Sequence, residues 1–193
     1  MAAIHLKSIS MLSNKYRQLL KQLARESIEY GLANQRALVV DLSTMPEAFS
    51  EQRATFVTLE KNNQLRGCIG MLEAQRALAE DVVFNSYAAA FSDSRFPPVE
   101  YHELANLSIH ISILTPAEQI KIQSELDLIK QLQAGIDGLI IEDNAHRATF
   151  LPSVWQSLPR AEDFVHHLKV KAGFKDDYWS KDIRAYRYST ESF

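Results

Sequence analysis

Two runs of β-branched and aromatic residues, joined by a short polar turn, limit the fold of this chain most strongly. The first run, Arg53–Leu59, contains Thr, Phe and Val in a composition typical of a β-strand. Lys61–Asn63 comes next, and asparagine tolerates the positive φ angles of a tight turn. Gln64–Gly70 then returns as a second strand. The pattern predicts a β-hairpin, and with it a sheet that contains antiparallel strands.

Hydrophobic spacing indicates further helices and strands along the rest of the chain. Helices are predicted over residues 14–31, with Ser13 as N-cap and Gly31 near the end, and over residues 76–91, 124–132 and 161–172. Strands are predicted over residues 107–114, 139–141, 148–150 and 183–188. Because the elements mix without a regular strand–helix–strand repeat, we expect an α+β fold with a mixed or mainly antiparallel sheet flanked by helices.

The charge balance and the short apolar segments restrict the class of function. Lys and Arg total 21 and Asp and Glu total 24, so no overall basic field attracts nucleic acid or a membrane. Arginines and tyrosines mix over residues 184–188, as in surfaces that stack on bases, but this balance favours a solvated strand face. Met1–Ser13 lacks the apolar run of a signal peptide, and no stretch approaches the roughly 20 apolar residues of a membrane span. We therefore expect a cytoplasmic protein with a single domain over residues 1–193.

The chain has one cysteine, Cys68. It therefore forms no intramolecular disulfide and supplies no multi-cysteine zinc site. The six histidines are scattered and lack the spacing of metal ligands. Two of only six glycines, Gly67 and Gly70, lie beside the cysteine. We expect no metal and no resident cofactor, and the segment around Cys68 becomes the first candidate site.

A regular strand over this segment would place Arg66, Cys68 and Gly70 on one face. Leu65 and Ile69 would share the opposite face, and they are natural core residues. Their burial would turn Arg66 and Cys68 away from the core. A guanidinium two residues from a thiol favours the thiolate, so Cys68 and Arg66 are the catalytic candidates.

The two glycines allow two interpretations. Glycine in a strand often marks a bulge or the close approach of a ligand or of another backbone. In the first interpretation, Gly67 and Gly70 leave the backbone open for a substrate. In the alternative, Cys68 is a small buried apolar residue and the glycines mark a packing kink.

A second candidate site is Asp93–Pro98, which follows the helix predicted over residues 76–91. Asp93 and Arg95 would pair with each other or line a cleft together with Phe96, while the prolines hold the chain extended. The alternative is a structural loop at the helix exit. His110 lies on the polar side of the alternating strand and is a candidate proton acceptor, or else a hydrogen-bonded structural histidine.

Taken in order, these motifs resemble the AMMECR-type domain family, whose bacterial members are called AmmeMemoRadiSam system protein A. The residues that carry the resemblance cover nearly the whole chain: Phe56–Leu59, Leu65–Gly70, Asp93–Pro98, Ile111–Pro116, Asp137–Leu139, Phe150–Val154 and Phe164–Gly173. Two positions depart from the family pattern. Ser94 stands where proline is usual, and His110 stands where an acidic residue is common.

The resemblance implies an α+β fold with a main sheet, a smaller second lobe intertwined with it, and the signature motif near a cleft. It also implies Memo-type and radical-SAM partner proteins, because the family's genes are often fused to or lie beside theirs. It assigns no reaction. Two hypotheses follow. In one, the protein binds a small molecule or a modified macromolecular substrate at Leu65–Gly70 as a cysteine-dependent accessory enzyme. In the other, it is a non-enzymatic adaptor that docks its partners.

Overall fold

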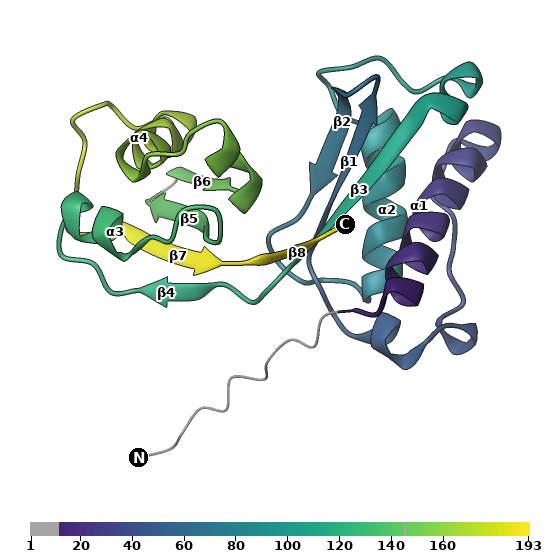
Figure 1. Cartoon of the computed structure of the whole chain (residues 1–193), viewed down its shortest axis with the longest axis horizontal. Helices are drawn as coiled ribbons and strands as arrows, with labels where there is room; N and C mark the ends of the chain where they lie inside the picture. Colours follow the sequence, from purple (N-terminus) through teal and green to yellow (C-terminus); the bar gives the residue numbers. More distant parts are fainter. Residues whose placement is uncertain (1–11, 145) are drawn as a thin grey trace. The chain divides into compact units, whose positions relative to one another are not determined.

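The computed structural model describes residues 12–144 and 146–193, so the expectation for the N-terminal segment lies almost wholly outside the described residues. The chain forms two compact units (Figure 1). The first unit contains the chain up to Leu114 together with Glu191–Phe193, and the second contains Thr115–Thr190. The chain thus leaves the first unit once and returns to it at its end.

The hairpin at the centre of the first unit is confirmed. Strands β1 (Thr55–Lys61) and β2 (Gln64–Gly70) pair antiparallel. Asn62 and Asn63 form the turn with φ angles of 54° and 60°, the left-handed conformation that a two-residue hairpin turn requires. The asparagines therefore decide where the chain reverses.

Two more strands complete this sheet, whose order is β2-β1-β3-β8. Strand β3 (Leu107–Leu114) has the predicted bounds and pairs antiparallel with β1. Strand β8 (Thr190–Ser192) was not predicted, because three residues carry too little alternation to be recognised. Beyond it, Ile111 and Phe193 exchange both backbone hydrogen bonds, at 2.9 and 3.1 Å. Because β2 stands first in the sheet order and, among the described strands, pairs only with β1, it is an edge strand of the sheet.

Helices cover one face of this sheet (Figure 1). Helix α2 (Leu78–Phe91) packs on β1 and β2, and α1 (Asn14–Asn34) packs on α2. Ser13 caps α1 as predicted, since its Oγ accepts from the backbone N–H of Tyr16 at 3.3 Å. Short 3₁₀ turns, which were not predicted, occur at η1 (Leu42–Thr44), η2 (Glu47–Ser50) and η3 (Tyr101–Asn106).

Gly31 lies inside α1, which continues three residues beyond it. A Cβ atom at Gly31 would come within 2.6 Å of the Phe91 ring and 2.7 Å of the Tyr87 ring. The glycine therefore lets two aromatic side chains of α2 pack directly on the backbone of α1. Its role is close helix packing. The helix ends instead at Asn34, and the C-cap residue Gln35 has a φ of 56°.

The two faces of the first sheet differ in polarity. Alternate residues of β1 and β3 are buried against the helices, among them Val57, Leu59, Ile109 and Ile111. The residues between them, including Thr58 and His110, point to the opposite face. An antiparallel sheet with one covered face leaves its second face to polar side chains, and this second face carries the candidate site.

The second unit is a smaller α+β assembly with the antiparallel sheet order β4-β7-β5-β6. Its strands are β4 (Glu118–Ile120), β5 (Gly138–Asp143), β6 (His146–Phe150) and β7 (Arg184–Tyr188), and its helices are α3 (Glu125–Gln131), the 3₁₀ turn η4 (Pro152–Gln156) and α4 (Ala161–Lys171). Strand β4 and turn η4 were not predicted. The other elements match predicted ones within a few residues.

Aromatic packing organises the interior of the second unit. The Trp155 ring stacks on Phe164 with centroids 3.9 Å apart, and the indole N–H donates to the carbonyl of Asp137 at 2.7 Å. The Tyr188 ring lies directly on Gly138, where a Cβ would come within 2.5 Å of it. Burial raises the pKa of Tyr188 to about 12. Gly138 is thus a packing glycine.

Helices combined with two antiparallel sheets confirm the α+β class. No helix in the described part of the chain is both long enough and apolar enough to cross a bilayer.

Candidate functional site

A β-bulge changes the geometry of the cysteine strand. Leu59 pairs with Gly67, but Glu60 pairs with Leu65, so Arg66 is an extra residue opposite β1. A one-residue shift moves every following side chain to the other face of a strand. The prediction that Leu65 joins Ile69 in the core is therefore wrong: Leu65 is 44% exposed, while Ile69 packs against the core.

At both glycines of the motif, neighbouring protein atoms occupy the space that a side chain would need. A Cβ at Gly67 would lie 2.1 Å from the carbonyl oxygen of Ala89, so β2 approaches the backbone of α2 closely there. A Cβ at Gly70 would lie 2.3 Å from the ring of Phe56. The geometry at both positions favours the packing interpretation over an opening for a substrate.

The backbone of Cys68 is held at both of its polar groups by the second predicted motif. Asp93 Oδ2 accepts from the Cys68 N–H at 2.8 Å, and Arg95 Nη2 donates to the Cys68 carbonyl at 3.3 Å. Asp93 and Arg95 are themselves joined by two side-chain hydrogen bonds of 2.9 and 2.6 Å and by one from the Arg95 backbone N–H to Asp93 Oδ1 at 3.2 Å. The two motifs thus meet, and the pair contacts the backbone of Cys68 rather than its thiol.

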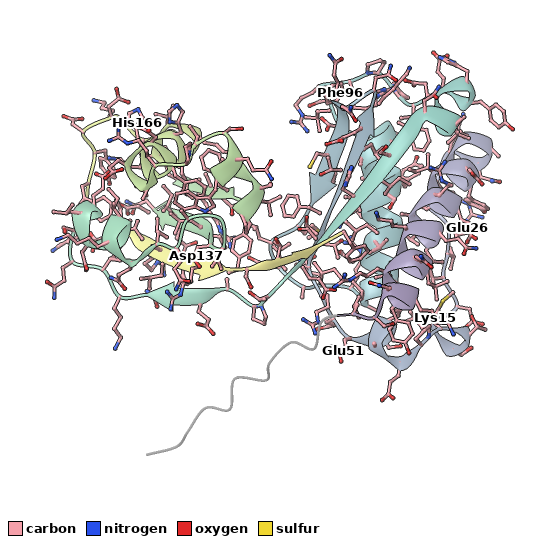
Figure 2. The ribbon with its side chains drawn as sticks, in the orientation of Figure 1. Lys15, Glu26, Glu51, Phe96, Asp137 and His166 are labelled. Atoms are coloured by element: carbon pink, nitrogen blue, oxygen red, sulfur yellow. The ribbon has the colours of Figure 1, made fainter. Side chains whose placement is uncertain are left out.

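The Asp93 carboxylate is buried, and its hydrogen-bond partners favour its charged form. The Arg95 guanidinium holds the pKa of Asp93 well below its usual range, helped by the Cys68 N–H. The same pairing raises the pKa of Arg95. Phe96 lies on the loop that follows α2 (Figure 2). Its ring centroid is 5.5 Å from Cζ of Arg95, whose side chain is 54% exposed. Asp93 therefore positions the strand and is not an acid or base near neutral pH.

Arg66 pairs with Glu103, a residue that the sequence analysis did not identify. Its Nε and Nη2 donate to both carboxylate oxygens of Glu103, at 3.1 and 2.8 Å, and Lys61 Nζ joins the same carboxylate at 2.8 Å. The Arg66 guanidinium lowers the pKa of Glu103 well below its usual range. Arg66 Nη1 is buried without an acceptor among the described residues. No motif marks Glu103, because it lies in a 3₁₀ turn that has no recognisable period.

The thiol itself lies on the face of the sheet opposite the helices. Cys68 is half-buried, and its Sγ lies 3.2 Å from Thr58 Oγ1, its cross-strand partner on β1. Thr58 is also the partner of His110 on β3. His110 Nε2 lies 3.4 Å from Glu60 Oε2. Sequence spacing named Cys68 and His110 separately, and the strand register places them on one face.

The charged side chains of the site are two carboxylates and three cations: Asp93 pairs with Arg95, and Glu103 pairs with both Arg66 and Lys61. The Cys68 thiol, beside the Thr58 hydroxyl, is the nucleophilic side chain next to them. Within residues 12–144 and 146–193, no three His, Cys, Asp or Glu side chains gather as metal ligands.

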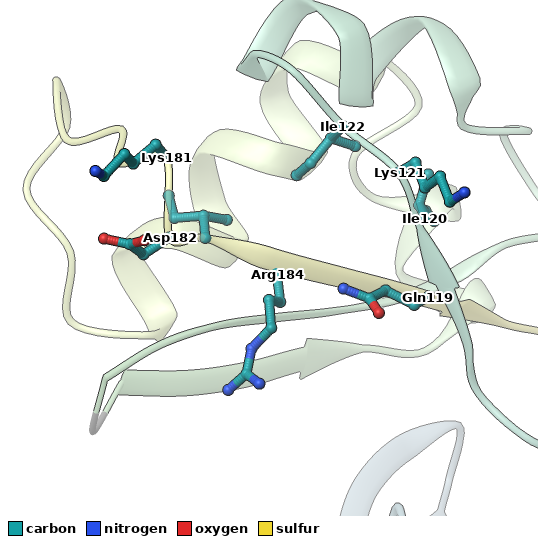
Figure 3. A pocket seen from close by; sticks show the side chains of 8 residues that line it. Gln119, Ile120, Lys121, Ile122, Lys181, Asp182 and Arg184 are labelled. Atoms are coloured by element: carbon teal, nitrogen blue, oxygen red, sulfur yellow. The ribbon is translucent and has the colours of Figure 1, made fainter.

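The second unit carries a separate hollow of about 410 Å³ (Figure 3). It lies beside strands β4 and β7 and is lined by isoleucines and by polar or charged side chains: Gln119, Ile120, Lys121, Ile122, Lys181, Asp182, Ile183 and Arg184. Lys121 and Lys181 lie at its two ends and point away from each other (Figure 3). The hollow contains none of the sequence-predicted site residues.

Fold and site define a class of protein: a two-unit α+β protein in which a bulged edge strand presents one cysteine, clamped by an aspartate–arginine pair. The AMMECR1 family model matches residues 21–193, and the chain belongs to this family.

Relatives in archaea extend over nearly the whole chain. A protein of Methanothermobacter thermautotrophicus is 35% identical over 180 residues, which cover 90% of this chain and 91% of that protein. Protein MJ0810 of Methanocaldococcus jannaschii is 35% identical over 178 residues, covering 88% and 85%. The crystal structure of the uncharacterized protein PH0010 from Pyrococcus horikoshii superposes with a TM-score of 0.86 at 30% identity, covering 94% of this chain and 92% of that one. The resemblance drawn from the motifs is confirmed.

Proposed function

We propose that this protein is a cysteine-dependent accessory enzyme that binds a small molecule or a modified macromolecular substrate at Leu65–Gly70. Cys68 is the reacting group. Arg66, Asp93 and Arg95 hold the strand that carries it, and Phe96 lies at the edge of the site. The lone thiol suits the reducing cytoplasm, where we place the protein.

The observation that supports this proposal is the contrast between the backbone and the side chain of Cys68. Its N–H and C=O are both bound by the Asp93–Arg95 pair, at 2.8 and 3.3 Å. Its thiol contacts the Thr58 hydroxyl, and the residue as a whole is half-buried. A reacting group works best on a rigid element whose own polar groups are satisfied, because little motion is then lost on binding.

Thiol chemistry tests the proposal directly, because Cys68 is the sole cysteine of the chain. We expect iodoacetamide to modify the native protein at a rate within tenfold of that of the urea-unfolded chain, and Cys68→Ala to abolish modification while leaving the unfolding midpoint nearly unchanged. A native thiol that reacts only after unfolding would contradict the proposal. Cys68→Ala that retains full activity in a reconstituted reaction with Memo-type and radical-SAM proteins would also contradict it.

An adaptor function is the second candidate, and one observation favours it. Leu65 is 44% exposed and Tyr101 is 81% exposed. Apolar side chains at these exposures suit contact with a partner protein. In this case Leu65→Glu and Tyr101→Glu would abolish co-purification with a Memo-type partner, and Cys68→Ala would leave it intact. The reverse pattern would favour the enzyme.

A further inference from the structure

The charged side chains around the cysteine strand carry more positive than negative charge. Lys61 and Arg66 share the carboxylate of Glu103, each through a nitrogen–oxygen distance of 2.8 Å. Arg95 pairs with Asp93 at 2.6 Å. Hydrogen bonds from the arginines hold the pKa of both carboxyls well below its usual range, so both are charged near neutral pH. Three cations against two carboxylates leave one net positive charge.

Two nitrogens of these arginines have no acceptor in the described chain. Arg95 donates to Asp93 through Nε and Nη2, and Nη2 also donates to the Cys68 carbonyl, but no described residue accepts from Nη1. Arg66 Nη1 is buried and likewise lacks an acceptor among the described residues. A carboxylate or phosphate accepts two N–H groups of a guanidinium at once. Because the Arg95 side chain is 54% exposed, its Nη1 is the donor that a ligand reaches from solvent.

Arg95 lies close to Cys68 at both the backbone and the sulfur. Its Nη2 is 3.3 Å from the Cys68 carbonyl oxygen. The hydrogen bond with Asp93 is the main cause that raises the pKa of Arg95, and the charge of an ionised Cys68 sulfur contributes to the same shift. Charges separated by more than about 10 Å are largely screened in salt, so this guanidinium acts on the sulfur at short range. A group bound to the Arg95 guanidinium is therefore within reach of the thiol.

We propose that the substrate of Cys68 is an anion, whose carboxylate or phosphate group binds the Arg95 guanidinium through Nη1. This inference rests on the proposed function, in which Cys68 reacts, and it adds the chemical class of the substrate. Asp93 holds one edge of the guanidinium, so the nitrogen that faces the ligand has a defined direction. The extra positive charge of Lys61 attracts an anion to the site.

The test compares an anionic and a neutral alkylating agent on the full-length protein in physiological salt. Iodoacetate and iodoacetamide both form an S–C bond with Cys68 and release iodide, but only iodoacetate carries a carboxylate. The ratio of their rate constants is measured in the native protein and in the urea-unfolded chain, where the charged side chains are dispersed. Both agents react with the same thiolate, so the ratio does not depend on how far the thiol is ionised.

The native ratio of iodoacetate to iodoacetamide should exceed the unfolded ratio by about tenfold, equivalent to about 1.4 kcal/mol. Arg95→Gln should lower the native ratio to the unfolded value or below it, since the Asp93 carboxylate then repels the anionic agent. Lys61→Gln leaves the pair of Asp93 and Arg95 intact and should lower the ratio by about threefold, because a partly exposed charge is screened by solvent. Circular dichroism verifies that each variant is folded.

Arg53→Gln is the matched control. Arg53 also donates two hydrogen bonds to one carboxylate, that of Glu51, but it lies five residues before Thr58, the partner of Cys68 on β1. Five residues of extended strand span about 16 Å, about twice the Debye length in physiological salt. The control should therefore keep the wild-type ratio. If Arg53→Gln lowers the ratio as much as Arg95→Gln, the preference comes from the overall charge and the inference is wrong.

Competing anions identify the group that the substrate carries. Alkylation of wild type by the neutral iodoacetamide is repeated with sodium phosphate or sodium acetate in place of sodium chloride, at equal ionic strength. Protection of Cys68 by either anion supports the inference, and the stronger protection identifies phosphate or carboxylate as that group. Arg95→Gln should abolish the protection.

Failure of the inference and failure of the proposed function give different results. If Cys68 is alkylated in the native protein but the native and unfolded ratios are equal, or neither anion protects the thiol, the substrate is not an anion bound at Arg95 and the proposed function stands. If both agents modify Cys68 only after unfolding, the proposed function fails and the inference fails with it.

Discussion

The Asp93 carboxylate lies 2.8 Å from the backbone nitrogen of Cys68, in the place that a neighbouring strand would otherwise occupy. Arg95 completes the arrangement by donating to the Cys68 carbonyl. Edge strands expose unpaired backbone groups that invite association, and proteins protect such edges with charged side chains. The pair therefore covers the edge of β2 and fixes the residue that bears the thiol.

Removing the carboxylate should destabilise the first unit strongly. Asp93→Ala leaves the partly buried Cys68 N–H and the exposed Arg95 guanidinium without their acceptor, and we expect a loss of about 2 kcal/mol in the free energy of unfolding. Asp93→Asn keeps one carbonyl oxygen and should lose about half of that. Urea titration measures both. Equal losses in the two variants would show that the charge, rather than the hydrogen bond, holds the edge.

Because Gly67 packs closely on α2, one added methyl group at this position should lower the free energy of unfolding strongly. Gly67→Ala places a Cβ 2.1 Å from the Ala89 carbonyl oxygen, a backbone atom that moves only with α2. We expect a loss of about 3 kcal/mol. Leu65→Ala on the same strand is the control and should change stability by less than about 1 kcal/mol, because that side chain is 44% exposed. A tolerated Gly67→Ala would contradict the packing role.

The Glu103 carboxylate predicts how stability depends on pH. Its pKa is lowered in the folded state, so its contribution is complete above the unfolded pKa of about 4.3 and is lost as the pH falls through the folded value. Glu103→Gln should be about 2 kcal/mol less stable than wild type at pH 7. The difference should shrink steadily below pH 4, as measured by thermal unfolding. A difference that stays constant down to pH 2 would exclude the ion pair as its cause.

The hairpin turn predicts a contrast between two substitutions at one position. Asn63 has a φ of 60°, which costs an ordinary L-residue about 1 kcal/mol. Asn63→Ala should therefore destabilise the protein by about that amount. Asn63→Gly should be neutral or slightly stabilising, because Asn-Gly suits this turn. Chemical denaturation measures the free energy of unfolding of both variants. Similar losses of stability in the two would show that a side-chain contact of Asn63, and not its positive φ, is the cause.

Local elements were predictable where one periodic signal dominated. The alternation over Leu107–Leu114 and the turn at Asn62 and Asn63 specified β3 and the hairpin without knowledge of the fold. Ser13 and Ser124 were identified as helix caps for the same reason, since the side chain that satisfies a helix end lies within three residues of it. The α+β class followed from the order of these elements.

Long-range relations escaped prediction wherever one residue changed the geometry. No amino-acid pattern marks the bulge at Arg66, yet the bulge turns the Leu65 side chain away from the core. Glu103 pairs with Arg66 across 37 residues of sequence, a separation at which no periodicity operates.

By itself, the sequence determined the family, the hairpin and the identity of the single thiol, because these depend on neighbours along the chain. Only the tertiary structure decided that Asp93 and Arg95 bind the backbone of Cys68, that the motif glycines are packed, and that Thr58 stands between Cys68 and His110. These relations depend on strand register and on the closeness of α2 to β2. Both are set by how whole elements pack, so no local pattern carries them.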